Sequence, residues 1–351
     1  MIKSLKLKNF TAFTNLEMNF SPGINVIIGE NGTGKTQLLK AAYAVYPEQK
    51  KLFDMNYEER NEMLTLRIMQ LYLPLDDKLG KLHHNGAKER AVIEIQFHDD
   101  SEFSFSFYNN SRKVKVSDNS VNKTNSENAV FIPTKEVLSF MWGFTSLYEK
   151  YGLTFDQTYK DICVMLDLPK LRNDIISEKS RWAIEEIKKV CGGEFIFSGG
   201  GKVDFKSGNI EYSANSTAEG FRKLGMLSRL LETGSIQPGK SGPLFWDEPG
   251  ANLNPKLMKM LVQVLLELSR NGQQIILATH DYVMLKWFDL LMDKEKGDQV
   301  LYHSLYRDPD STEIKIHSTN DYLELSPNSI DDAFGDIIDD EISKGMGDLG
   351  K

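Results

Sequence analysis

The residues from Gly29 to Thr36 read GENGTGKT, with a lysine and a threonine directly after the last glycine. The run Ile24 to Ile28, apolar except at Asn25, precedes this loop as a buried strand should, and the helix-forming residues Gln37 to Ala42 follow it. Glycines between a strand and a helix let backbone N–H groups approach phosphate oxygens, because no Cβ intervenes. The pattern predicts a P-loop; the alternative, a chance glycine-rich turn, does not explain the flanking strand and helix.

Each part of the loop has a predicted role in holding ATP. The Lys35 ammonium reaches the outer phosphates, and the Thr36 hydroxyl ligates Mg²⁺. The N-terminus of the helix that follows adds partial positive charge at the phosphates. The candidate nucleotide-binding residues of the loop are Gly29, Glu30, Asn31, Gly32, Thr33, Gly34, Lys35 and Thr36.

Composition limits what surrounds this loop. The 351 residues are 40% hydrophobic and 26% charged, which suits a globular chain with one large or two ordinary cores. No apolar run approaches the roughly 20 residues of a membrane span, and the opening MIKSLKLKNF lacks the apolar core of a signal peptide. We expect a cytoplasmic, soluble protein with no membrane partner. Cys163 and Cys191 lack metal-ligand spacing and are expected to be reduced thiols.

The order of patterns predicts an α/β fold whose P-loop core comes from two separate segments, with a mostly parallel core sheet. Antiparallel strands are expected at Val92–Phe97 and Phe103–Phe107, because apolar and polar residues alternate there. The expected division is a P-loop core at 1–44 and 203–325, an antiparallel β lobe with inserted helices at 45–136, a helical lobe at 137–202 and an acidic tail at 326–351.

Several shorter segments are assigned in the same way. A polar loop is expected at Ser117–Asn128 and a short buried strand at Ala129–Ile132. The glycines at 199–201 are predicted to form a hairpin turn in a small meander, because a second phosphate loop would need spaced glycines and a following helix. The mixed-charge stretch Lys170–Lys189 reads as helical.

A second chemical signal is Asp247-Glu248, which follows the apolar residues 244–246. A P-loop site needs one carboxylate to hold Mg²⁺ and another group to orient the attacking water, and Asp247 and Glu248 suit these two roles. Taken alone, such a pair would be an ordinary strand end. A helix follows it, with Asn254 as N-cap and Asn271-Gly272 as its end.

His280 stands at the end of the next apolar strand, residues 274–278. The carboxyl ends of parallel strands form the edge at which open α/β sheets bind ligands. Read alone, His280 could be a surface histidine. Because His280 follows the P-loop and the Asp247-Glu248 pair in chain order, it is predicted to contact the γ-phosphate of ATP.

Together, LKLKNF at 5–10 with Phe13, the GENGTGKT loop, DEPGANLNP at 247–255 and ATHD at 278–281 resemble the ABC-type ATPase heads of SMC, RecF and OLD-like proteins. The resemblance covers roughly residues 1–44 and 210–282. It implies that two heads dimerise around two ATP–Mg²⁺ molecules, and that a signature helix of one head caps the nucleotide of the other.

The position of that signature holds NSTAEG at 215–220, with Thr217 and Ala218 where glycines are common in the class. The resemblance makes Ser216 and Glu219 candidate nucleotide contacts. The same two residues also have the spacing of a capping box at an ordinary helix start, and both readings can hold together. By the same resemblance, residues 250–254 cross the dimer interface, and Lys135-Glu136 stands where the class often has a glutamine lever.

The segment after His280 shows no nuclease motif of the kind that OLD-like proteins append, and no long heptad arms interrupt the chain. The chain therefore resembles the stand-alone AAA ATPases of bacterial antiphage defence operons, which act beside a separately encoded effector such as a nuclease. A RecF-like DNA-repair or DNA-clamp ATPase is the alternative, and a transporter motor subunit is a third. Genomic neighbourhood separates the first two.

The charged segments leave further alternatives open. The net charge of −8 argues against a uniformly basic nucleic-acid binder. A local basic face at 170–189 could still contact nucleic acid, although such a stretch is usually a solvated surface. In the acidic tail, a metal cluster is less expected than an amphipathic helix with four residues facing inward, namely Phe334, Ile337, Ile338 and Ile342.

The predicted mechanism is in-line attack of water on ATP without a covalent intermediate. Lys35 stabilises the phosphates, Glu248 orients the water and His280 contacts the γ-phosphate, which makes these three the candidate catalytic residues. Thr36 and Asp247 are the candidate ligands of Mg²⁺. The expected partners are a second copy of the chain, or a higher oligomer, and a separate effector.

Overall fold

The core of the protein is a six-stranded sheet that is parallel except at one edge. The computed structural model describes residues 1–46, 55–117, 128–311 and 313–349. Along the sheet the strands are β14 (Ile314–Thr319), β13 (Val300–Arg307), β3 (Ile24–Gly29), β12 (Ile275–Ala278), β11 (Leu244–Asp247) and β7 (Val130–Ile132). Only β14 runs antiparallel to its neighbour. The predicted α/β fold with a mostly parallel core sheet is confirmed.

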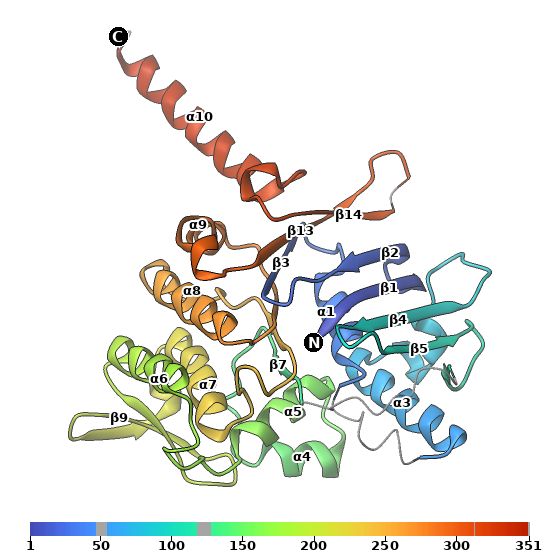
Figure 1. Ribbon diagram of the computed structural model, residues 1–351, viewed down its shortest axis with the longest axis horizontal. Helices are drawn as coiled ribbons and strands as arrows, with labels where there is room; N and C mark the ends of the chain where they lie inside the picture. The colour runs from blue at the N-terminus through green and yellow to red at the C-terminus, as the bar shows by residue number, and fades with distance from the viewer. Residues whose placement is uncertain (47–54, 118–127, 312, 350–351) are drawn as a thin grey trace.

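A second, antiparallel sheet lies beside the core (Figure 1). Its strands, in spatial order, are β2 (Phe13–Asn19), β1 (Ile2–Phe10), β4 (Ala91–Phe97), β5 (Glu102–Phe107) and β6 (Lys115–Val116). The first two strands were expected in the P-loop core and β7 in the antiparallel lobe, so both assignments differ from the structure. The reason is long-range pairing: β1 aligns Leu5 with Ile95, and β7 aligns Ile132 with Trp246.

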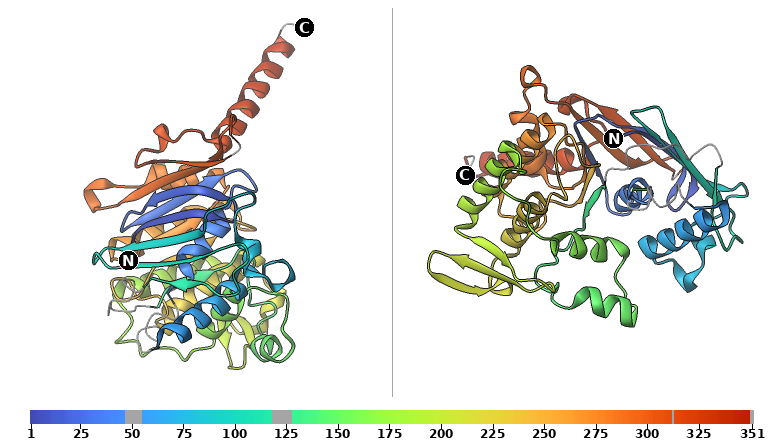
Figure 2. Two further views of the ribbon diagram at one scale, coloured as in Figure 1. Left: turned by 90° about the vertical axis from the view of Figure 1, so that its right-hand side faces the viewer. Right: turned by 60° about the horizontal axis from the view of Figure 1, so that its bottom comes forward.

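The helices cover the sheets on several sides (Figures 1 and 2). In chain order they are α1 (Lys35–Tyr43), α3 (Tyr57–Tyr72), α4 (Phe144–Tyr151), α5 (Gln157–Leu166), α6 (Glu178–Cys191), α7 (Glu219–Thr233), α8 (Pro255–Arg270), α9 (Tyr282–Leu291) and α10 (Ser329–Leu349). Short 3-10 turns are η1 (Leu75–Asp77), η2 (Leu79–Leu82), η4 (Ala214–Ser216), η5 (Lys294–Lys296) and η6 (Tyr322–Glu324). Within the described residues, no helix is long and apolar enough to cross a membrane.

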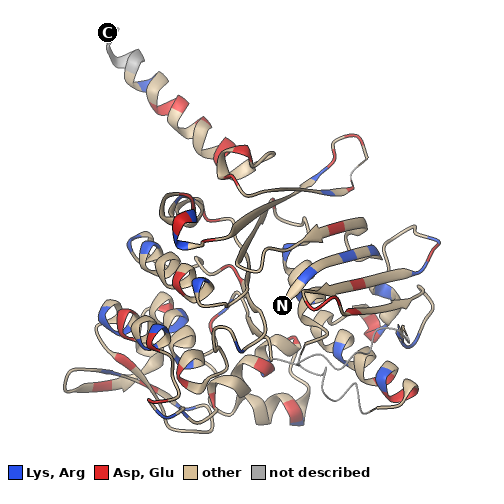
Figure 3. Cartoon of the chain, in the orientation of Figure 1, with Lys and Arg blue, Asp and Glu red and all other residues tan. Residues whose placement is uncertain are grey.

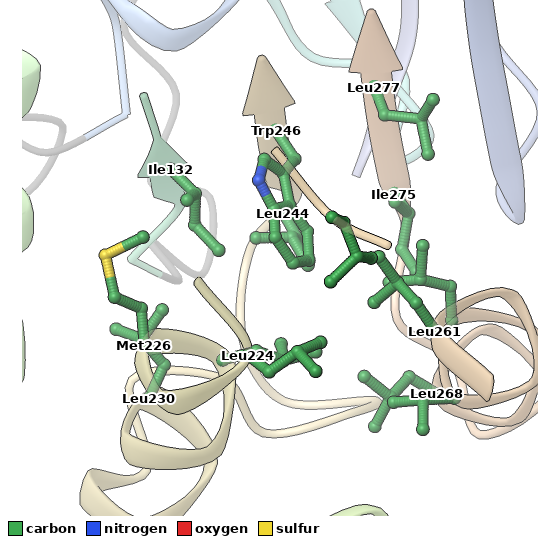
Figure 4. Packing of buried hydrophobic residues seen from close by; sticks show 14 of the residues in the cluster. Ile132, Leu224, Met226, Leu230, Leu244, Trp246, Leu261, Leu268, Ile275 and Leu277 are labelled. Atoms are coloured by element: carbon green, nitrogen blue, oxygen red, sulfur yellow. The ribbon is translucent and has the colours of Figure 1, made fainter. Parts of the chain in front are cut away.

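The central strands β3, β11 and β12 are buried along their whole length, as expected for parallel strands covered on both faces. Alternate side chains enter two different cores. One face of the sheet, with Leu244 and Trp246, packs on α7 and α8 (Figure 4). The other face, with Ile27 and Phe245, packs on α1 and the antiparallel sheet. The P-loop helix is therefore held inside the second core.

A three-stranded meander of β8 (Glu194–Phe197), β9 (Val203–Ser207) and β10 (Ile210–Ser213) precedes α7. The glycines at 199–201 all have positive φ and form the turn between β8 and β9, which confirms the predicted hairpin. The polar loop predicted at Ser117–Asn128 lies largely outside the described residues.

The predicted ends of α8 are confirmed. The side chain of Asn254 accepts a hydrogen bond from the N–H of Lys256 at the start of the helix, and Asn271 is its C-cap. The stretch Lys170–Lys189, in contrast, becomes helical only at Glu178. Its lysines pair with acids, for example Lys179 with Glu267 at 2.7 Å, so part of the local positive charge is balanced. Contact of this stretch with nucleic acid stays a prediction.

The acidic tail forms helix α10, as predicted. Phe334 packs on the body, but the inward packing predicted for Ile337, Ile338 and Ile342 is wrong. The helix points away from the body of the protein (Figures 1 and 2). Its base is held by stacking of Phe334 on Tyr282 and by a hydrogen bond from Tyr322 to Asp331. Beyond that base, the described part of the chain has no element beside the helix in these views. The exposed fractions there are 53% for Ile337, 51% for Ile338 and 48% for Ile342, against 38% for Phe334 at the base.

Both cysteines are free and buried, in agreement with the predicted reduced thiols. Burial raises the pKa of Cys163 and of Cys191 to about 12, so neither is a reactive thiolate near neutral pH. Among the described residues, no group of His, Cys, Asp and Glu is arranged to hold a metal ion by itself. The acidic residues of α10 are spread along the helix (Figure 3).

Candidate active site at the carboxyl edge of the core sheet

The loop between β3 and α1 has a backbone that only glycine adopts easily. Gly29, Gly32 and Gly34 have φ values of 149°, 81° and 90°. A Cβ at Gly29 would lie 2.3 Å from the carbonyl oxygen of Leu305, and one at Gly34 would lie 2.7 Å from the ring of Phe13. The loop is therefore a cradle of backbone groups at the N-terminus of α1, which suits a phosphate.

The side chain of Lys35 lies along this loop. Its Nζ donates to the carbonyl oxygens of Gly29, at 2.6 Å, and Glu30, at 3.2 Å. Burial lowers the pKa of Lys35, while the carboxylates of Glu248 and Asp247 act in the opposite direction. The P-loop lysine thus lies within electrostatic reach of the two acidic residues predicted from a distant part of the sequence.

Asp247 ends β11 and receives two hydroxyl groups on one oxygen. Its Oδ2 accepts a hydrogen bond from Thr36 Oγ1, at 2.9 Å, and from Thr134 Oγ1, at 2.8 Å. A hydroxyl and a carboxylate at the mouth of a phosphate-binding loop are the oxygen ligands that Mg²⁺ prefers. The donor set fits an ATP-bound Mg²⁺ ion, with Thr36 and Asp247 as the residues that would hold it.

Glu248 has an unusual backbone for a residue with a side chain, because its φ is 52°. Such left-handed conformations cost about 1–3 kcal/mol and concentrate at functional sites. The N–H of Glu248 donates to the carbonyl oxygen of Ala278 at 2.9 Å. Its carboxylate accepts from the His280 backbone N–H at 3.2 Å and lies 2.8 Å from His280 Nδ1. The structure therefore brings Glu248 and His280 together.

The capping box predicted from Ser216 and Glu219 is wrong. Ala218 is the N-cap of α7 without a side-chain hydrogen bond, and Ser216 belongs to the preceding turn η4. The carboxylate of Glu219 instead accepts from Asn252 Nδ2 at 2.8 Å. Ser216 is exposed. Within the described part of the chain, neither side chain bonds to the P-loop, so contact with a nucleotide held by another copy stays a prediction for both.

The segment after β7 contacts two parts of the site. Thr134 reaches Asp247, as described above. Two residues later, the buried carboxylate of Glu136 pairs with Arg222 of α7, with 2.7 Å between Oε1 and Nε. Lys135 is exposed. The lever role for Lys135-Glu136 stays a prediction, and the ion pair shows that this segment is joined to the start of α7.

Sequence reasoning missed three residues of the site. Thr134 follows β7, whose parallel pairing with β11 places it beside Asp247; its position after a short apolar strand was the available signal. Arg307 donates to the carbonyl oxygen of Gly32 at 3.0 Å, and no local pattern marks it. Lys223 is 1% exposed and donates to the carbonyl oxygen of Glu248 at 3.1 Å. A lysine on the buried face of a predicted helix was the signal for it.

Parts of this chain are similar to known proteins. Residues 4–139 match the model of the AAA domain family. A Rad50 ATPase described as acting in DNA double-strand break repair, from Methanococcus maripaludis, is 30% identical over 129 residues, which are 31% of this chain and 13% of the relative. The DNA replication and repair protein RecF of Listeria welshimeri is 52% identical over 40 residues, 11% of each chain. The matched parts are thus small fractions of both relatives.

The fold is similar over a longer stretch. A crystal structure of an SMC head bound to the C-terminal winged-helix domain of ScpA covers 91% of this chain and 97% of its own, with 17% identity and a TM-score of 0.54. The SMC head domain from Thermotoga maritima matches with 16% identity and a TM-score of 0.50, over 91% and 98% of the two chains. This chain therefore has an α/β fold similar to that of SMC heads, and its P-loop lies within the segment that matches the AAA domain model.

Proposed function

We propose that this chain, an ATPase head of the SMC, Rad50 and RecF type, binds ATP with Mg²⁺, dimerises on it and hydrolyses it. The observation that carries the proposal is the meeting of three separate motifs at one edge of the core sheet. Thr36 of the P-loop bonds to Asp247, and Glu248 contacts His280. The arrangement holds a phosphate cradle, a metal-binding pair and a carboxylate next to it, which are the parts that phosphoryl transfer to water requires.

In the proposed reaction, water attacks the γ-phosphate in line. Glu248 accepts a hydrogen bond from that water and orients it, while Lys35 and the loop N–H groups stabilise the charge on the phosphate oxygens. His280 contacts the γ-phosphate from the neighbouring strand end. Mg²⁺ neutralises charge on the phosphates when bound, and Thr36 and Asp247 would hold it.

For the biological context, the relatives favour the DNA-repair reading, RecF-like or Rad50-like, over a transporter. Both curated relatives carry repair in their names, and the SMC head resembles this chain over nearly its whole length. We propose that the head couples ATP-driven dimerisation to work on DNA. If so, double-stranded DNA should raise the rate of ATP hydrolysis of the purified chain, and a rate independent of DNA would count against this context.

A second candidate is regulation of a separate effector in antiphage defence, and α10 is the observation that favours it. The helix projects from the body with three isoleucines about half exposed, as a surface kept for a protein partner would be (Figure 1). The test is co-expression with the product of the neighbouring gene. Ile338→Asp should abolish co-purification without changing ATP hydrolysis, whereas retained co-purification would show that α10 is not the contact.

Hydrolysis itself is tested with Glu248→Gln and Lys35→Ala. Glu248→Gln should bind ATP as the wild type does and lose about 100-fold or more in kcat, because water loses its oriented acceptor. Lys35→Ala should weaken ATP binding as well. ATP binding is measured with a fluorescent analogue and hydrolysis by phosphate release. Near-wild-type turnover by Glu248→Gln protein would rule out the assigned role.

A further inference from the structure

Two adjacent basic residues on α7 point to different parts of the site. Arg222 pairs with Glu136 after β7, and Lys223 donates from Nζ to the backbone carbonyl oxygen of Glu248 at 3.1 Å. Lys223 is only 1% exposed, and among the described residues its ammonium forms no salt bridge. A buried ammonium without a paired carboxylate is costly, so its contact with the Glu248 carbonyl calls for an explanation.

The carbonyl that Lys223 holds belongs to the residue with the left-handed backbone. The same oxygen accepts a second hydrogen bond, from the N–H of Ala251 at 3.2 Å, so both of its lone pairs are used. These two bonds fix the peptide that follows Glu248, and with it the direction of the side chain that precedes that peptide. Burial lowers the pKa of Lys223, and the carboxylates of Glu219, Glu248, Asp247 and Glu136 oppose that shift.

Helix α7 also packs against the loop 248–254 with no spare room. A Cβ at Gly220 would lie 2.9 Å from the carbonyl oxygen of Asn252, a distance that side chains do not tolerate without displacement. The neighbouring Glu219 accepts from Asn252 Nδ2 at 2.8 Å. The first turns of α7 therefore touch this loop through Glu219, Gly220 and Lys223, and a shift of the helix must move the loop.

We propose that Lys223 is a positioning residue, which orients the Glu248 carboxylate through the Glu248 backbone and so transmits the position of α7 to the reaction. This inference rests on the proposed ATPase function. It explains how the position of α7 could be coupled to hydrolysis within one head. When α7 is displaced, the carbonyl of Glu248 loses a hydrogen-bond donor, and the Glu248 carboxylate loses its fixed direction. Among the described residues, Lys223 donates to the Glu248 carbonyl and makes no hydrogen bond to the P-loop.

The test is Lys223→Met, which keeps the length of the side chain and removes its donor. We expect kcat for ATP to fall about tenfold or more, while KM stays within about twofold, because the loop that binds ATP is unchanged. A purely structural role would lower the melting temperature without this split between kcat and KM. In the Glu248→Gln background, Lys223→Met should cost little more in single-turnover rate, since residues that act through each other are not additive.

Arg229 offers a matched control on the same helix. It is also buried, at 5% exposure, but donates to the carbonyl oxygens of Leu166 and Leu168, away from the site. Arg229→Met should lower thermal stability and leave kcat near the wild-type value. An equal loss of kcat in both variants would mean that any disturbance of α7 has this effect, and it would overturn the proposal for Lys223.

The outcomes separate the two proposals. Wild-type protein without ATPase activity contradicts the proposed function itself. If the wild type is active and Glu248→Gln is impaired, the proposed function holds. If Lys223→Met then folds and keeps the wild-type kcat, only the role of Lys223 is contradicted. If Lys223→Met does not fold, Gly220→Ala tests the coupling instead, because its added Cβ pushes α7 away from the loop 248–254 without removing a charge. Folded Gly220→Ala with unchanged kcat would then overturn the coupling.

Discussion

The Nδ1 atom of His280 lies 2.8 Å from Oε1 of Glu248, and the backbone N–H of the same histidine donates to the other carboxylate oxygen at 3.2 Å. The two residues follow β12 and β11, which pair in parallel with Asp247 opposite Ala278. The contact therefore results from strand order in the sheet. It makes the proposed water-orienting residue and the proposed phosphate contact one unit.

His280→Ala should lower kcat about 10- to 100-fold, because the carboxylate loses an orienting partner and the γ-phosphate loses a contact. Combined with Glu248→Gln, it should cost little more than Glu248→Gln alone. Phosphate release under saturating ATP measures both effects. The control is His98→Ala, a surface histidine after β4, which should hydrolyse ATP as the wild type does. Fully additive losses would show that His280 and Glu248 act separately.

Thr134→Val should weaken activation by Mg²⁺. The hydroxyl of Thr134 donates to Asp247 Oδ2 at 2.8 Å, and valine keeps its shape without that donor. Residues that orient a metal ligand typically change metal affinity about 10- to 100-fold when removed. A titration of ATP hydrolysis with Mg²⁺ should show a higher half-activating concentration, with Thr134→Ser close to the wild type. An unchanged titration for Thr134→Val would leave Thr134 without a role in metal binding.

Ser216→Arg should prevent ATP-dependent dimerisation. Ser216 is exposed before α7, where the resemblance to SMC and RecF heads places the contact with the partner's nucleotide. In Glu248→Gln protein, ATP with Mg²⁺ should give a dimer by light scattering, and an added bulky arginine at 216 should give a monomer. Ser198→Arg, an exposed change in the β8–β9 turn, is the control and should still dimerise. One mass for all variants, with and without ATP, would contradict the head-to-head model.

His303 should make stability depend on pH. It is fully buried in β13, and burial lowers its pKa from 6.5 to about 3. Between these values the unfolded chain binds a proton that the folded chain does not, so stability falls as pH drops below about 6.5. From pH 6.5 to 5 this one group should cost about 2 kcal/mol.

The measurement for His303 is urea unfolding at several pH values for wild type and His303→Gln. Other groups titrate in both proteins, so the difference between the two curves isolates His303. The variant should lose less stability than the wild type on acidification, even if it starts lower at pH 7. Parallel curves would show that His303 is protonated in the folded protein.

The parts of the site that could be predicted from the sequence are those with a local signal. The glycines and Lys35 of the P-loop, the Asp247-Glu248 pair and His280 each stand directly after an apolar strand. Strand periodicity and glycine spacing act over a few residues, so they can be read without knowing which strands are neighbours. The cap at Asn254 could be predicted for the same reason.

The features of the site and fold that only the tertiary structure decided depend on contacts between residues that are distant in the sequence. Thr36 and Asp247 are 211 positions apart, and only the strand order joins them. Thr134 and Lys223 likewise lie in the site only because of contacts between distant parts of the chain. The first two strands joined the antiparallel sheet because β1 pairs with β4 near residue 95 and β2 pairs with β1. The isoleucines of α10 stayed exposed because no element of the described chain packs over them. Pairing and burial are properties of the assembled fold, and local periodicity carries no information about either.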